Sequence, residues 1–266
     1  MTRRPSRALI AAELAALVAA IVVALLGDGF AVWDLTALGT LLVLAVVSDL
    51  TAIDVPAHRM RLSASFMSIV VAIAFFGGPP AAAIGVISIL AGWARDRYPK
   101  DYLLINLVTY AWFPLIGGWG FHEATAAADA GPADPVFYLL VIALFCVTLA
   151  INFCLIAAYT CYEEGSRFTA KVRRTLIPVL PSELASAVLA MGIAYAYAEL
   201  GLAALALFGA ALVIFQRLVG ALLLSQERAD ELEVRARQLA GFQVALLSAL
   251  LRTLDVRDRM TARHSA

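Results

Sequence analysis

The stretch VFYLLVIALFCVTLAINFCLIAAYTCY, residues 136–162, contains no Asp, Glu, Lys or Arg. A helix that crosses a bilayer needs about 20 consecutive, mostly apolar residues, so this stretch is long enough to do so. Over all 266 residues, 62% are hydrophobic and only 15% are charged, whereas soluble domains carry about 25% charged residues. The sequence therefore predicts a membrane protein whose first partner is the lipid bilayer.

Eight apolar segments of this kind follow one another along the chain. The first is longer than the apolar core of a signal peptide, so we expect it to be retained as a helix. The third and fourth are short and are separated only by Gly77–Pro80, which predicts a tight hairpin or a re-entrant pair. The expected fold is therefore all-α, a polytopic bundle of about eight spans or of six plus a re-entrant pair. The segments are 8–26, 35–53, 62–76, 81–94, 102–121, 136–162, 176–198 and 202–224.

The basic residues predict the orientation. All 20 Lys and Arg fall at one side of this arrangement, and the alternate connections contain none. An excess of Lys and Arg marks cytoplasmic loops, so we expect a multi-pass protein of the cytoplasmic (inner) membrane with both termini in the cytoplasm. The longest outside loop runs between Phe121 and Val136, which leaves no room for an external binding domain. The basic groups lie at 3–7, 59–61, 95–100, 167–174 and from 217 onward.

Polar residues within the spans are the candidate sensing residues, because buried charge and amide groups are costly in lipid. They are Glu13, Asn106, Asn152 and Glu183. Each also has an ordinary explanation. Glu13 lies near a helix start and would hydrate at the interface. Glu183 follows two prolines in a pattern typical of a helix N-terminus, where a carboxylate is favoured, and the two asparagines would hydrogen-bond between helices.

Other residues of the spans indicate packing. Cys146, Cys154 and Cys161 repeat at about two helical turns, as packing residues on one face would. Gly117 and Gly118, close after a proline, predict a kinked and closely packed fifth helix. Asp49 and Asp54 flank the inner end of the second segment, near His58, Arg59 and Arg61, and predict a solvated cytoplasmic cluster. The acidic and basic charges cancel overall, so the composition indicates no nucleic-acid partner.

Beyond Leu224 the chain is polar and rich in helix-forming residues. Leucines at 232, 239 and 246 repeat every seven residues, with Phe242 and Leu250 beside them. Such a seam predicts a cytoplasmic helix, 225–248, that pairs with a partner helix. We expect a homodimer through this helix. The alternative is a solvated amphipathic helix that lies on its own domain.

The end of the chain resembles a known family. Residues 254–265 read Leu-Asp-Val-Arg-Asp-Arg-Met-Thr-Ala-Arg-His-Ser. This order closely resembles the opening of the HD-domain metal-dependent phosphohydrolases, above all the HD-GYP cyclic-di-GMP phosphodiesterases. Residues 249–266 would then be the first helix of such a domain, and the resemblance makes His264 its first metal ligand. Met260 stands where some members have a Glu that binds an additional metal, which points to a two-metal site.

The resemblance implies a catalytic site of two divalent ions, Fe or Mn, whose bridging hydroxide attacks a phosphodiester. One histidine does not hold a catalytic metal, because such sites need at least three protein ligands. We therefore expect no catalytic residue, no cofactor and no activity in these 266 residues, which have the pattern of a truncated product or a fragment. Intact, the protein would be a metal-dependent phosphodiesterase.

The leading hypothesis is thus a membrane sensory region, 1–224, joined through a signalling helix to an HD-type output domain. The sequence names no sensed molecule. A small transporter or channel with a helical tail is the main alternative, and it would need paired charges or interrupted helices in the membrane. A membrane-embedded enzyme would need a carboxylate or histidine cluster at one membrane face, and the sequence shows none.

Overall fold

The computed structural model divides into two compact units, Met1–Gln216 and Arg217–Ala266, which are described separately. The sequence analysis placed the end of the membrane region at residue 224. The residues that the structure describes are 7–26, 31–51, 53–55, 60–62 and 65–211 in the first unit, with 214, and 217, 218, 221, 225, 228, 229, 231–243 and 246 in the second.

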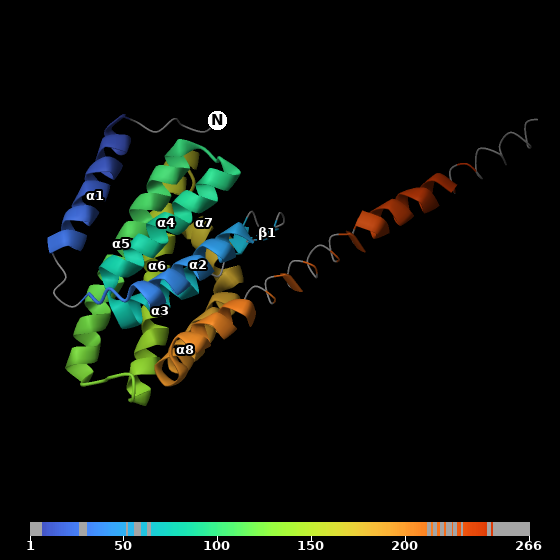
Figure 1. The fold of residues 1–266 in the computed structure, drawn as a ribbon. Helices are drawn as coiled ribbons and strands as arrows, with labels where there is room; N and C mark the ends of the chain where they lie inside the picture. The colour runs from blue at the N-terminus through green and yellow to red at the C-terminus, as the bar shows by residue number, and fades with distance from the viewer. Residues whose placement is uncertain are drawn as a thin grey trace, which may run out of the picture. The chain divides into compact units, whose positions relative to one another are not determined.

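The first unit is a bundle of helices (Figure 1), so the expected helical fold is confirmed. Each of the eight predicted apolar segments contains a helix. Asp34 caps the second one, because its carboxylate accepts hydrogen bonds from the amides of Thr36 and Ala37 at 2.9 and 3.1 Å. The helices are α1 (Arg7–Leu26), α2 (Leu35–Leu50), α3 (Ser65–Phe76), α4 (Gly78–Asp96), α5 (Lys100–Ala128), α6 (Pro135–Glu164), α7 (Phe168–Lys171), the π-helix η2 (Val172–Leu176), α8 (Ile177–Leu200) and a further helix Leu202–Ala211.

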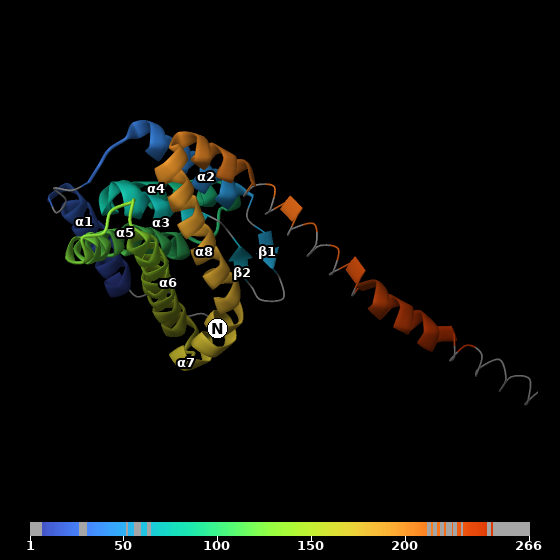
Figure 2. The same cartoon turned by 90° about the horizontal axis from the view of Figure 1, so that it is seen from below.

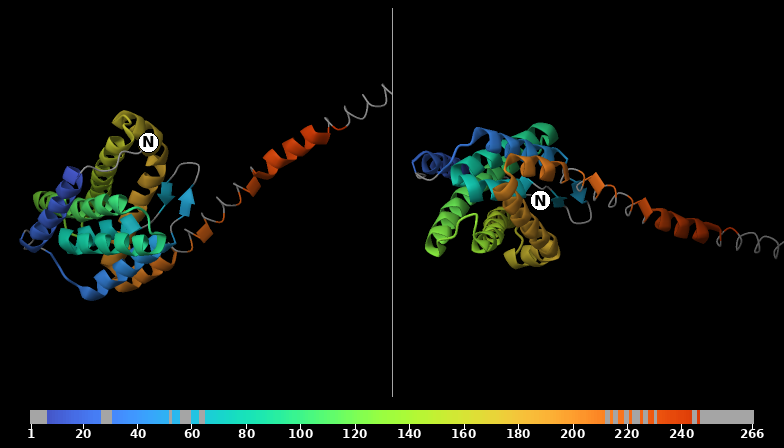
Figure 3. Two further views of the ribbon diagram at one scale, coloured as in Figure 1. Left: turned by 90° about the horizontal axis from the view of Figure 1, so that it is seen from above. Right: turned by 60° about the horizontal axis from the view of Figure 1, so that its bottom comes forward.

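Two short strands, which the sequence analysis did not expect, lie between α2 and α3. β1 (Ile53–Val55) and β2 (Met60–Leu62) pair antiparallel, with Ile53 opposite Leu62. Figure 3 shows them as blue arrows beyond the end of α2. A hairpin of three-residue strands has little stability of its own, so it serves as the connection between two helices.

Helix α3 forms the centre of the bundle. Ten of its 12 residues are buried, and residues 69 to 72 are completely inaccessible to solvent. It packs against α2, α4, α5, α6 and α8. Twelve residues rise about 18 Å, which is short of the roughly 30 Å hydrocarbon core of a bilayer. α3 is therefore a core helix.

A single residue joins α3 to α4, which is the tight turn that the sequence predicted. Gly77 has φ 88° and ψ 178°, a backbone conformation that side chains with a Cβ rarely adopt. Pro79 and Pro80 follow in the first turn of α4, where the missing amide hydrogens cost nothing because those amides have no partner within the helix. The glycine thus reverses the chain and the prolines begin the next helix.

The start of α4 lies directly against the middle of α5. A Cβ built on Gly118 would lie 2.5 Å from the backbone nitrogen of Gly78 and 2.6 Å from its Cα. One on Gly117 would lie 2.6 Å from the Cγ2 of Thr148 on α6. The two glycines therefore allow α5 to approach both neighbouring helices, and the predicted close packing of this helix is confirmed.

The helix through α7, η2 and α8 is continuous from Phe168 to Leu200, and Figure 2 shows α8 beside α6 with α7 at the end that joins them. This corrects two expectations. The basic residues 171–174 lie in the helix and not in a loop, and Glu183 is the seventh residue of α8 and not a helix cap. Pro178 has no amide hydrogen to donate, and the π-helix η2 lies just before it.

The expected outside loop is shorter than predicted. α5 continues to Ala128 and α6 begins at Pro135, so that only residues 129–134 connect them. The sequence Glu-Ala-Thr-Ala-Ala-Ala extends α5 because alanine has the highest helix propensity. Asp129 ends the helix in the left-handed conformation with φ 49°.

Among the residues that the structure describes, four helices are long and apolar enough to cross a membrane, whereas about eight spans, or six plus a re-entrant pair, were predicted. They are Arg7–Leu26, Lys100–Ala128, Pro135–Glu164 and Phe168–Leu200. Many large apolar side chains on their outer faces are exposed, including Leu26 at 82% and Val188 at 55%. Such a surface is unfavourable in water and favourable against lipid, which agrees with a membrane protein.

Candidate functional site

The largest cavity that we describe in the first unit has a volume of about 710 Å³ and lies among α2, α4, α5, α6 and the segment from η2 to α8. Asn106, Asn152 and Glu183 all line it. Three of the four predicted sensing residues, which are far apart in the sequence, are therefore brought to one place. A volume of this size is in the usual range for a small-molecule pocket.

Helix α5 and the turn before it contribute a polar stripe to the cavity. Tyr98, Tyr102, Asn106 and Tyr110 all line it and follow one another at intervals of four residues. Residues four apart lie on the same face of a helix, so the stripe extends along one side of α5. Tyr110 is held by an edge-to-face contact with Phe113 at 5.2 Å between ring centroids.

The opposite walls come from α6 and from the segment from η2 to α8. Asn152 and Phe153 line the cavity from α6, and Thr175, Val179 and Glu183 line it from the other segment. Glu183 also borders a smaller cavity of about 90 Å³ between α6 and α8.

Two polar atoms at this cavity lack hydrogen-bond partners. Ser88 is completely buried on α4, and its Oγ has no hydrogen-bond partner; the Oδ1 of Asn152 is likewise buried and unpaired. Both residues line the cavity. The expected hydrogen bond between helices is therefore not made by this oxygen of Asn152. Buried polar atoms are almost always paired, so these two mark places where a polar ligand group or water would be stabilised.

Asp49 is a second carboxylate at the cavity, and it is held in place from α3. The hydroxyl of Ser65 donates a hydrogen bond of 2.9 Å to its Oδ1. Asp49 was predicted to belong to a solvated cytoplasmic cluster, but its side chain is half-buried at the end of α2. The side chains of the other residues of that cluster lie outside the described part.

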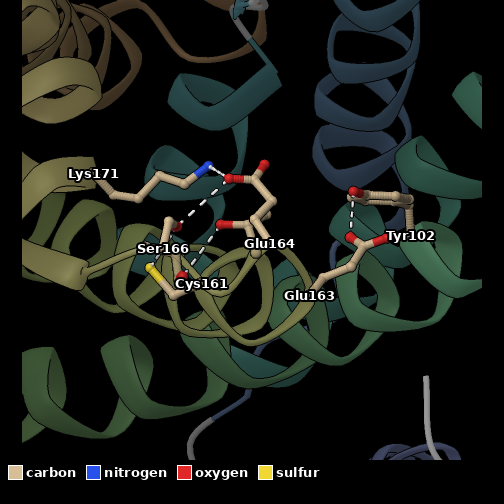
Figure 4. A network of polar contacts seen from close by, with 8 residues as sticks. Tyr102, Cys161, Glu163, Glu164, Ser166 and Lys171 are labelled. Atoms are coloured by element: carbon tan, nitrogen blue, oxygen red, sulfur yellow. Dashed lines mark hydrogen bonds and ion pairs between the residues drawn. The ribbon is translucent and has the colours of Figure 1, made fainter. Parts of the chain in front are cut away.

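A network of polar contacts joins the edge of the cavity to the ends of α5, α6 and α7 (Figure 4). The hydroxyl of Tyr102 donates a hydrogen bond to the carboxylate of Glu163. Next to it along α6, Glu164 forms an ion pair with Lys171 of α7 at 2.8 Å. Tyr102 belongs both to the cavity wall and to this network, so a ligand that moves its ring would act on the junction of α6 and α7.

Glu13, the fourth predicted sensing residue, does not line this cavity. It is only 6% exposed on α1, and its Oε1 is buried without a hydrogen-bond partner. One turn along α1, the indole of Trp112 on α5 donates a hydrogen bond to the carbonyl of Ala16 at 3.0 Å. The expectation that Glu13 is hydrated at a helix end is therefore wrong, because packing of α1 on α5 encloses it.

In the second unit, residues 231–243 are helical, as predicted. Leu232, Leu239, Phe242 and Leu246 are between 50% and 65% exposed, so the predicted seam is an uncovered apolar face in one copy of the chain. Ion pairs at i and i+4 join Glu231 to Arg235 at 3.6 Å and Glu233 to Arg237. The fifth seam residue, Leu250, and the predicted metal ligand, His264, lie outside the described residues.

The tyrosines and Ser88 line the cavity but were not predicted as site residues. The four-residue spacing of residues 98, 102, 106 and 110 was a usable signal, because it predicts a polar stripe on an apolar helix. Ser88 had no such signal, since its environment depends on helices that are distant in sequence. Among the residues that the structure describes, no group of three His, Cys, Asp or Glu residues is placed to hold a metal ion.

Comparison with known proteins gives no relative from which a role could be transferred. No protein-family model, no curated protein and no solved structure matches the chain.

Proposed function

We propose that residues 1–224 form a membrane sensory region that binds a small molecule in the cavity among α2, α4, α5, α6 and α8. The observation that carries this proposal is the convergence of Asn106, Asn152 and Glu183 on one cavity of about 710 Å³. Polar groups are costly inside a membrane unless they serve a purpose. Here they gather from three helices around a space that fits a ligand.

The η2–α8 segment provides a route for the signal out of the cavity. Thr175 and Glu183 belong to one continuous helix that ends at Leu200 and is followed, after Gly201, by the helix that begins at Leu202. The π-helix η2 lies at the cavity wall, and π-helical turns occur frequently at functional sites. A ligand that changes the packing of α8 would therefore act on the segment that leads to the cytoplasmic helix predicted for residues 225–248, which we name the exit helix.

The orientation supports a cytoplasmic or membrane-borne signal. We propose a multi-pass arrangement in the inner membrane, in which the short helix α3 forms a re-entrant pair with α4 between six crossings, with both termini in the cytoplasm, on the basis of the one-sided Lys and Arg. In that orientation each helix contributes its cytoplasmic half to the cavity, from Asp49 at the end of α2 to Glu183 near the start of α8. The ligand would then enter from the cytoplasm or from the inner leaflet.

For the output we propose an HD-type phosphohydrolase that acts on cyclic-di-GMP, with another nucleotide phosphoester as the fallback substrate. The support is the resemblance of residues 254–265 to the opening of the HD-GYP group. His264 would be the first ligand of a site of two divalent ions, Fe or Mn, and the remaining ligands would come from residues after 266.

The sensory role predicts that changes in the cavity alter the activity of an attached output domain. The test joins the 266-residue chain to the remainder of an HD-GYP phosphodiesterase domain and measures cyclic-di-GMP hydrolysis in proteoliposomes. We expect Asn152→Leu and Glu183→Gln to change the rate by at least about threefold, which corresponds to less than 1 kcal/mol of coupling free energy. Val188→Leu is the control, because Val188 is on α8 and faces outward. Equal rates in all variants would refute the sensory role.

We further propose that the exit helix passes the signal on as a parallel homodimer. Both copies leave the same membrane face, so paired tails must point in the same direction. Leu232, Leu239, Phe242 and Leu246 are exposed in a single copy. Each leucine buried at such a seam contributes about 1.5–3 kcal/mol, and confinement in one bilayer lowers the cost of association.

The dimer predicts a periodic pattern of cross-links. Single cysteines placed in turn from residue 232 to 246, in a background without Cys146, Cys154 and Cys161, should form disulfides with a period of about 3.5 residues. Maxima are expected at Leu232, Leu239 and Leu246. A uniform pattern, or no cross-linking, would leave a solvated single helix as the correct description.

A small transporter is the second candidate, because the cavity brings together two carboxylates, Asp49 and Glu183. Grouped charges in the membrane are typical of transporters. Uptake of a ligand into proteoliposomes that contain the chain alone would favour transport. Binding without uptake would favour the sensory role.

A further inference from the structure

We propose that the cavity binds a protonated organic amine, whose ammonium group is held by the carboxylate of Glu183 and by the unpaired Oδ1 of Asn152. This inference rests on the proposed use of the cavity as the signal-binding site, and it names the chemical class of the ligand. Three properties of the cavity support it: its charge, its unpaired acceptors and its aromatic walls.

The charge of the cavity is negative. Glu183 and Asp49 line it, and the described lining residues include no Lys, Arg or His. Glu183 forms no hydrogen bond or ion pair in the described structure. Glu183 is half-buried, and taking a carboxylate partly out of water without a partner is costly, so a cationic ligand would be favourable here. An anionic ligand would add to the cost.

The unpaired atoms are acceptors. The carboxylate of Glu183 accepts only, and the buried Oδ1 of Asn152 also lacks a donor. An ammonium group offers up to three N–H donors in different directions, so one group could meet both requirements. Ser88 Oγ, buried and unpaired on α4, provides a further polar position on another wall.

The remaining walls suit an apolar or aromatic body. Tyr110 and Phe153 line the cavity together with aliphatic residues of α6 and α8. Aromatic faces attract cations and also pack against other rings. A bare metal ion would leave most of a 710 Å³ space unfilled, so the cavity favours an amine with an organic body over an inorganic cation.

The test is calorimetric titration of the full 266-residue chain in lipid nanodiscs at neutral pH. The probes are butylamine, 2-phenylethylamine and tyramine, all protonated under these conditions. 2-Phenylethanol is the neutral counterpart with the same body, and sodium chloride at equal ionic strength represents an inorganic cation. We expect at least one amine to bind, with 2-phenylethanol and sodium chloride giving no saturable signal.

Two variants on the same helix identify the anchor. Glu183→Gln keeps the shape and removes the charge, and we expect it to weaken amine binding by at least about tenfold, as the loss of a hydrogen bond to a charged group does. Glu199→Gln makes the same change at an exposed position of α8 outside the cavity, and we expect it to bind as the unmodified chain does. Helix content measured by circular dichroism confirms that each variant is folded.

Three results would overturn the proposal: no binding of any of the three amines, equal binding of 2-phenylethanol, or unchanged affinity in a folded Glu183→Gln variant. These outcomes are separate from the failure of the sensory role. The titration reports binding alone, whereas the phosphodiesterase fusion reports output. Amine binding without any change in output would keep the ligand class and reject the sensor.

Discussion

Gly118→Val is expected to destabilise the bundle by about 3 kcal/mol or more, because overpacking a closely packed contact usually costs 1–3 kcal/mol and here the obstacle is backbone. The new Cβ would lie 2.5 Å from the nitrogen of Gly78. This is a backbone atom, so no change of side-chain rotamer can relieve the clash. The start of α4 and the turn at Gly77 would have to move away from α5. Unfolding in detergent by added sodium dodecyl sulfate, followed by circular dichroism, measures the loss.

Gly120→Val is the matched control. It makes the same change two residues further along α5, where a Cβ meets nothing within 4 Å, and we expect its stability to lie within about 0.5 kcal/mol of the unmodified chain. Gly118→Ala should fall between the two. If Gly118→Val and Gly120→Val unfold at the same detergent fraction, the close crossing of α4 and α5 is wrong.

The second large effect is expected in labelling of introduced cysteines on intact cells. A cysteine at Ala127, exposed in the last turn of α5, should react fully with a membrane-impermeant maleimide. One at Ser166, between α6 and α7, should not react. The reason is the proposed orientation, in which the 20 Lys and Arg lie on the cytoplasmic side and Ser166 lies with them.

The same maleimide reaction on inside-out vesicles is the control for burial of residue 166. It uses the same background without native cysteines. Ser166 is half-buried and its hydroxyl contacts the Sγ of Cys161 at 3.6 Å, so weak labelling on cells could have a local cause. In inside-out vesicles Ser166→Cys should react and Ala127→Cys should be protected. The opposite pattern in both preparations would reverse the topology and move the mouth of the cavity to the outside.

Helix positions could be predicted where apolar length alone determines them. The segments 8–26 and 136–162 became α1 (Arg7–Leu26) and α6 (Pro135–Glu164), because nothing interrupts either run. The prediction was less accurate where local propensity competes with hydropathy. Alanines after Glu123 extend α5 past its apolar part, and the prolines near Glu183 lie inside a helix that tertiary packing keeps continuous.

The candidate site could be predicted only in part. Polarity within a span was enough to select Asn106, Asn152 and Glu183, since few explanations exist for polar groups in lipid. It was not enough to show that they meet, because that depends on how α5, α6 and α8 cross. For the same reason Glu13 was selected with them although it lies elsewhere, and Asp49 was omitted although its contact with Ser65 brings it to the cavity.

The burial of α3 has a consequence for how the protein is made. This helix is too short to be stable in lipid by itself, and it depends on contacts with α5, α6 and α8, all of which are synthesised after it. At about 5–20 residues per second, the ribosome reaches Leu200 roughly 6–25 s after it completes α3. During that interval α3 lacks its contacts with the helices that are synthesised later. The newly made chain therefore depends on the insertion machinery until α8 enters the membrane and completes the fold.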